Sequence, residues 1–186
     1  MRLFPDAKII LPVRAPVSHV ASLVRQHQWF CQGQRKHSRA LAWMQRSGHF
    51  ELGRDRRPMN LGDGERVRAI QRAWAAGEEV RGWACYWDMV YGHLTGLLDA
   101  DAQVRAATKL VHFEDLCAAP AETIRAVLDH CALPDGERVV ARFTPSIRSP
   151  DYYQSPFSSE ELALIREQTA STANAMQGGS GPIISS

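Results

Sequence analysis

The sequence lacks several of the features that would assign a protein directly to a class. Its four cysteines form no CxxC pair and match no zinc-site spacing, and its seven histidines show no pairing suited to a metal triad. No stretch approaches the roughly 20 apolar residues of a membrane-spanning helix. The first residues lack the basic and apolar regions of a signal peptide. These absences predict a soluble cytoplasmic protein with no bound metal and no membrane span.

The net charge is also small, and lysine is rare. The formal net charge of +2 is too small to indicate nucleic acid or an anionic membrane surface as a partner. Only three lysines accompany nineteen arginines. Arginine is the better bidentate partner for phosphate, although codon composition alone can produce this bias in an alanine-rich chain. The length of 186 residues, with 45% hydrophobic and 23% charged residues, fits one globular domain.

Two short apolar runs, Lys8–Val13 and Lys109–Phe113, predict strands buried on both faces of a parallel sheet. Pro16 and Pro120 follow them and predict the first turns of helices. Arg14 then lies at the carboxyl end of a strand, where ligands bind in open α/β sheets. Because two strands make a poor sheet by themselves, we expect an α/β fold with an incomplete parallel sheet and a predominantly helical remainder.

The polar segment 32–64 is basic and rich in glycine, with one possible helix over 40–46. Its cluster Arg54–Pro58 is typical of a solvated loop, and alternatively of a lid or a substrate-facing segment. Helices are expected over Glu65–Ala76 and Glu78–Leu98, with an aromatic stripe at helical spacing that indicates a core.

The first strand carries a more specific pattern. The run Phe4-Pro5-Asp6-Ala7-Lys8, the apolar strand, Arg14-Ala15-Pro16 and Ser22 together resemble the 3′-phosphate-binding segment of sulfotransferases. These enzymes use 3′-phosphoadenosine 5′-phosphosulfate as the sulfuryl donor. Further on, Leu110–Leu116 resembles the strand and YEDL-type turn of the family. Weaker similarities to bacterial members lie at Gly48–Glu51 through Trp87 and at Pro150–Tyr153.

The resemblance implies a P-loop-NTPase-like sulfotransferase fold. On this basis residues 1–176 form a partial sulfotransferase domain, and residues 177–186 form a flexible tail. Within the domain, the 3′-phosphate-binding strand and helix occupy 8–28, a helical insertion occupies 32–98, and a strand–helix–helix segment occupies 109–176.

The resemblance also implies three cofactor-binding residues. Arg14 and Ser22 would bind the 3′-phosphate, and Phe113 would lie near the adenine. The spacing is consistent with this, because an arginine at a strand end can offer its planar fork to an anion near a helix N-terminus. The alternative is an arginine that caps something locally and a serine that is simply a small helix residue. Glu114 and Asp115 are expected to hold the turn rather than to act in catalysis.

One essential part of such an enzyme has no counterpart in the sequence. No Gly-x-x-x-x-Gly-Lys-Ser/Thr cradle for the 5′-phosphosulfate occurs, and in many relatives the catalytic base lies upstream of the matched region. We therefore assign no catalytic residue and expect the chain alone to be inactive. The alternatives are a non-catalytic module that binds 3′-phosphoadenosine nucleotides, and an interaction remnant that exposes Trp74, Trp83 and Trp87. The sequence identifies neither the acceptor nor the oligomeric state.

Overall fold

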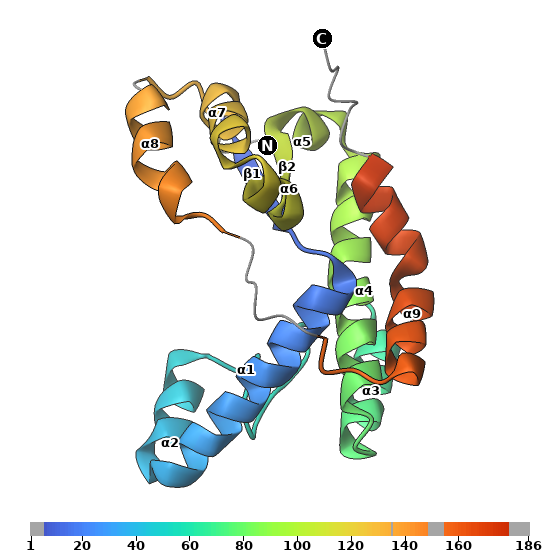
Figure 1. The fold of residues 1–186 in the computed structure, drawn as a ribbon. Coiled ribbons are helices and arrows are strands. Elements are labelled where there is room, and N and C mark those ends of the chain that lie inside the picture. Colours follow the sequence, from blue (N-terminus) through green and yellow to red (C-terminus); the bar gives the residue numbers. More distant parts are fainter. Residues whose placement is uncertain (1–5, 135, 149–154, 179–186) are drawn as a thin grey trace. The chain divides into compact units, whose positions relative to one another are not determined.

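The computed structural model describes residues 6–134, 136–148 and 155–178 (Figure 1). In this part the chain is mostly helical, with one parallel sheet of two strands. It divides into two compact units. The sheet unit comprises Met1–Ala15, Leu94–Gln154 and Ala173–Ser186, and the helical unit comprises Pro16–His93 and Ser155–Thr172. Each unit is described by itself.

The sheet unit contains strands β1 (Ile9–Val13) and β2 (Thr108–His112), which pair in parallel. The register aligns Ile9 with Thr108 and Val13 with His112, so both strands end at the same level. Helix α5 (Ala102–Ala107) leads directly into β2, and helix α6 (Phe113–Ala118) leaves it. The residues that follow the two strands therefore lie at one edge of the sheet.

Two further helices lie wholly within the sheet unit. Helix α7 (Pro120–His130) packs against β2, and His130 Nε2 lies 2.9 Å from the carbonyl oxygen of Ala107. Helix α8 (Gly136–Phe143) packs on α7, continues into a 3₁₀ turn at Thr144–Ser146, and is joined to α7 by the exposed Arg125–Glu137 ion pair. The buried side chain on α8 is Val140.

The helical unit is built on long helices. Helices α1 (Pro16–Lys36) and α2 (Ser38–Ser47) form one hairpin, and α3 (Gly64–Ala75) and α4 (Glu79–Ala100) form another around Gly77, whose φ is 80°. Helix α9 (Ser159–Gly178) runs beside α4 (Figure 1). Its start is a capping box in which the amide of Glu161 donates to Ser158 Oγ and the amide of Ser158 donates to Glu161 Oε2.

A single carboxylate links three of these helices. Asp88 on α4 pairs with Arg66 on α3 and accepts a 2.5 Å hydrogen bond from Thr172 Oγ1 on α9. The core beside it is aromatic: Trp74, Trp83 and Trp87 are all buried, with the Trp74 and Trp83 rings 4.7 Å apart. The prediction of a core stripe is therefore confirmed at Trp83 and Trp87, whereas Leu97, at the end of the same predicted stripe, is 48% exposed. The alternative in which Trp74, Trp83 and Trp87 are exposed is wrong.

Most predicted elements agree with the structure, but the prediction that both strands are buried on both faces is wrong. In β1 only Val13 is buried and Ile9 is 37% exposed, because the described sheet has two strands and little to cover its faces. The turn expected at Glu114–Leu116 is instead helix α6, because Phe113 already takes helical geometry directly after the strand. Helix α1 continues past residue 28 to Lys36. Helices α5 and α8 are too short for their periodicity to be visible. The similarity at residues 150–153 and the tail from 179 onward lie outside the described residues. Among the described helices, none has the length and apolarity needed to cross a membrane.

Candidate functional site

The structure brings two of the three predicted site residues together. Arg14 directly follows β1 and Phe113 directly follows β2, and the in-register pairing of the strands makes them neighbours. The Arg14 guanidinium carbon lies 4.8 Å from the centre of the Phe113 ring. This distance is within the range of a cation–π contact. Both side chains are half-buried, so the pair is neither fully solvated nor locked in a core.

A backbone contact ties the two strand ends together. The amide of Ala15 donates a 3.0 Å hydrogen bond to Glu114 Oε1. The side chain of Glu114 thus bonds across to the segment after β1, whereas the sequence predicts that it holds its own turn. That part of the prediction is wrong, because the parallel pairing places the Ala15 amide within reach of the carboxylate. The Glu114 carboxylate thus holds the segment that follows β1 against the end of β2.

Ser22, the third predicted residue, belongs to the helical unit. It lies in the second turn of α1, which begins at Pro16, and its side chain is half-buried. The sheet unit therefore brings Arg14 and Phe113 together, and the assignment of Ser22 to the same anion stays a prediction.

The geometry determines what the Arg14–Phe113 pair can bind. A guanidinium stacked on a ring keeps N–H groups directed outward in its own plane, which suits the oxygens of a phosphate. The same stacking occupies one face of the Phe113 ring. A planar base would therefore use the other face or the ring edge. Among the described residues, no group of three or more histidine, cysteine or carboxylate side chains is arranged to hold a metal ion.

Comparisons with known proteins add no identification. No family model, no curated protein and no solved structure matches the chain. The sulfotransferase resemblance, the donor nucleotide and the roles of Arg14, Ser22 and Phe113 therefore stay predictions.

A second polar cluster, which the sequence does not reveal, lies in the helical unit. Arg56 from the arginine-rich loop forms a two-pronged ion pair with Glu79, and its guanidinium lies 4.3 Å from the Trp74 ring centre and 5.5 Å from that of Trp83. The Arg56 side chain is only 10% exposed. The prediction of a solvated loop is therefore wrong at Arg56, because aromatic faces and a carboxylate hold it inside. Periodicity in the sequence relates residues only a few positions apart, so it does not reveal the Arg56–Glu79 contact, which joins residues 23 positions apart.

The cluster extends to His27 on α1. The amide of Gly53 donates to His27 Nδ1 at 3.2 Å, and Cys31 Sγ lies 3.5 Å from His27 Nε2. Burial lowers the pKa of His27, the charge of Arg56 lowers it further, and Glu79 opposes both. Burial raises the pKa of the Cys31 thiol, which argues against a reactive thiolate. We interpret the cluster as a structural core.

The lowered pKa of His27 predicts a pH-dependent stability. The unfolded chain takes up a proton near pH 6.5 that the folded protein still excludes, so the free energy of unfolding falls as the pH drops from about 6.5 toward the lowered pKa. His27→Asn retains an acceptor for the Gly53 amide and removes the titration. We expect the free energy of unfolding of this variant to decline less between about pH 7 and 5 than that of the unmodified chain. Urea unfolding followed by tryptophan fluorescence measures both.

His49→Asn is the matched control, because His49 is exposed and lies outside the cluster; since its ring stacks on Trp43, all three proteins are also followed by circular dichroism. It should retain the full decline. An equal pH dependence for His27→Asn and the unmodified chain would contradict the assignment of the decline in stability to His27.

Proposed function

We propose that this chain is the 3′-phosphate-binding part of a sulfotransferase-type protein with a P-loop-NTPase-like fold. In this proposal Arg14 and Ser22 bind the 3′-phosphate of 3′-phosphoadenosine 5′-phosphosulfate, and Phe113 lies beside the adenine. The donor then transfers its sulfuryl group to an acceptor, a reaction that depends on positioning and charge stabilisation around the transferred group. The sequence contains no glycine–lysine cradle for the 5′-phosphosulfate. We therefore expect nucleotide binding without turnover from the chain alone.

One observation carries this proposal. The Arg14 guanidinium is stacked on Phe113 at the carboxyl ends of two parallel strands, where ligands bind in open α/β sheets. The bond from the Ala15 amide to Glu114 holds the two strand ends in this arrangement. A purely local capping arginine would need no aromatic partner at the end of a strand that starts 94 residues later in the sequence.

Calorimetric titration of the full chain with 3′-phosphoadenosine 5′-phosphate tests the proposal. We expect Arg14→Ala to weaken binding about ten- to a hundredfold, since the variant loses charge-assisted hydrogen bonds to the phosphate. Adenosine 5′-monophosphate, which lacks the 3′-phosphate, should bind the unmodified chain as weakly as the 3′-phosphorylated nucleotide binds the variant.

The matched control is Arg142→Ala, which removes another arginine stacked on a phenylalanine, Phe143, elsewhere in the sheet unit. It should leave binding unchanged. If circular dichroism shows a folded chain that does not bind the nucleotide, or if Arg14→Ala binds normally, the proposal is wrong. Sulfuryl transfer by the unmodified chain would instead contradict the expectation that it is inactive alone.

A further inference from the structure

The hairpin of α1 and α2 has a charge distribution that the net charge of the chain conceals. Residues 14–50 contain no aspartate or glutamate at all. Exposed cations lie at the end of α1 and along α2: Arg35, Lys36, Arg39 and Arg46. Within the described part of the chain, no carboxylate forms an ion pair with any of these four. These four cations therefore form a positive surface on the hairpin, and no carboxylate of the described residues is paired with them.

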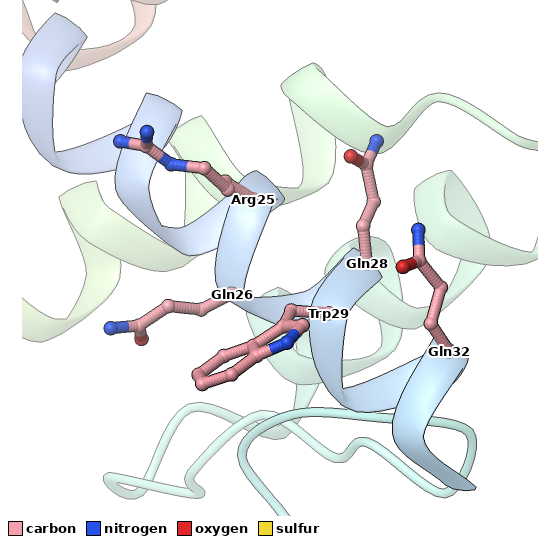
Figure 2. Close-up of a pocket in the computed structure, with 5 residues that line it drawn as sticks. All are labelled: Arg25, Gln26, Gln28, Trp29 and Gln32. Atoms are coloured by element: carbon pink, nitrogen blue, oxygen red, sulfur yellow. The ribbon is translucent and has the colours of Figure 1, made fainter. Parts of the chain in front are cut away.

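Large aromatic side chains project from the same hairpin. Trp29 on α1 is 72% exposed and Trp43 on α2 is 60% exposed. Figure 2 shows Trp29 projecting from α1 among Arg25, Gln26, Gln28 and Gln32, which together line a hollow of about 370 Å³. Side chains of this size are normally buried in a monomeric protein, and their exposure together marks an interaction surface.

The helical spacing places cations on both sides of each tryptophan. On α2, Arg39 and Arg46 lie four residues before and three residues after Trp43, which puts all three on one face. On α1, Arg25 and Lys36 lie four residues before and seven residues after Trp29, again on its face. The two helices thus repeat one pattern, a tryptophan between two basic side chains.

A cavity joins the aromatic residues of the two helices. It has a volume of about 360 Å³ and is walled by Trp29 and Phe30 from α1 and by Trp43 and Met44 from α2. Its remaining wall residues are Gly33, Gln34, His37 and Ala40. We call the surface formed by Trp29, Phe30, Trp43, Lys36, Arg39 and Arg46 the Trp29/Trp43 face.

We propose that the Trp29/Trp43 face docks on an anionic phospholipid surface. Peripheral membrane helices combine exposed tryptophan or phenylalanine with lysine and arginine, since the rings enter the headgroup region and the cations attract anionic lipids. The absence of acidic residues from 14–50 supplies the charge complementarity. This inference goes beyond the proposed nucleotide site of Arg14, Ser22 and Phe113, shares no residue with it and does not depend on it.

The ring geometry favours a lipid surface over single-stranded nucleic acid. Nucleic-acid bases stack on open aromatic faces. One face of Trp43 is already covered by His49, whose ring is stacked at 6.0 Å, and Trp29 meets Phe30 edge to face at 80°. These contacts occupy part of the ring surface on which a base would stack, whereas insertion among headgroups requires only that the apolar rings leave water.

Flotation with lipid vesicles tests the proposal on the full chain. We expect binding to vesicles of phosphatidylcholine with about one third phosphatidylserine, and little binding to phosphatidylcholine alone. Arg39→Ala with Arg46→Ala should weaken partitioning about thirtyfold, because each basic residue near an anionic surface contributes about fivefold. Trp29→Ala with Trp43→Ala should weaken it comparably, and the binding that remains should still require phosphatidylserine, because this variant keeps all the cations.

The matched control is Arg142→Ala with Phe143→Ala, which removes an exposed aromatic ring and its stacked arginine from α8. It should bind vesicles as the unmodified chain does. Because all the altered side chains are exposed, circular dichroism should show every variant folded. Absence of vesicle binding, or binding that survives both double variants, overturns the proposal. Binding of a single-stranded oligonucleotide that both variants abolish, without vesicle binding, assigns the face to nucleic acid instead.

Discussion

Gly82→Ala should lower the free energy of unfolding by about 1–2 kcal/mol. Gly82 lies in α4 against α3, and a methyl group at this position would overlap the indole ring of Trp74. That ring cannot retreat easily, because Trp83 and Tyr86 pack on it and Arg56 covers one of its faces. Overpacking of this kind commonly costs about 1–3 kcal/mol. It must also exceed the gain of about 1 kcal/mol that alanine brings to a helix over glycine.

Gly96→Ala on the same helix separates the two effects. Position 96 is exposed, and nothing lies within 4 Å of a methyl group placed there. Only the helix-propensity gain remains, so this variant should be more stable than the unmodified chain by up to about 1 kcal/mol. Urea unfolding followed by circular dichroism measures both variants. Equal stability of Gly82→Ala and Gly96→Ala would show that α3 and α4 do not pack as closely as described.

The sequence predicts the elements of this fold better than their contacts. The strands and most of the helices follow from short apolar runs, helical periodicity and proline at first turns, all of which act over a few residues. The proximity of Arg14 and Phe113 can also be predicted from the sequence, since each residue immediately follows a predicted strand. The stacking distance, and the bond of Glu114 to the opposite strand end, depend on the strand register and are visible only in three dimensions.

For the arginine-rich segments, composition does not predict which side chains are buried. The cluster Arg54–Pro58 has the composition of a solvated loop, yet Arg56 is buried against two indoles while its neighbour Arg57 stacks on the less buried Phe50. Composition is blind to this difference because it depends on partners supplied by α3 and α4. The charge of the α1–α2 hairpin is hidden in a similar way, since acidic residues elsewhere in the chain bring the total to +2. Local charge, and not net charge, therefore indicates where partners bind.

Arg56→Met should lower the free energy of unfolding by about 2 kcal/mol near neutral pH. The variant loses the two-pronged bond to Glu79 and the contacts with the Trp74 and Trp83 rings, and it leaves Glu79 without its cation. Breaking a fully buried ion pair costs about 3–5 kcal/mol. The Glu79 side chain is about one third exposed, so solvent screening reduces the cost here. Arg81→Met, which breaks an exposed pair with Glu78 nearby, should cost no more than about 0.5 kcal/mol.

The pH dependence of the Arg56→Met defect distinguishes an ion pair from simple packing. Burial alone would raise the pKa of Glu79, but the hydrogen bond and the charge of Arg56 outweigh it and hold the pKa below its ordinary value of 4.5. The stabilisation by this pair is therefore complete above about pH 4.5 and is lost as the pH falls through the lowered pKa. In Arg56→Met, the bond and the charge of Arg56 no longer oppose the effect of burial on Glu79, so its carboxyl takes up a proton more readily and the penalty is relieved in acid. The difference in unfolding free energy between the two proteins should shrink from about pH 7 to about pH 3. A difference that stays constant across this range would mean that Arg56 acts only through its contacts with the indole rings.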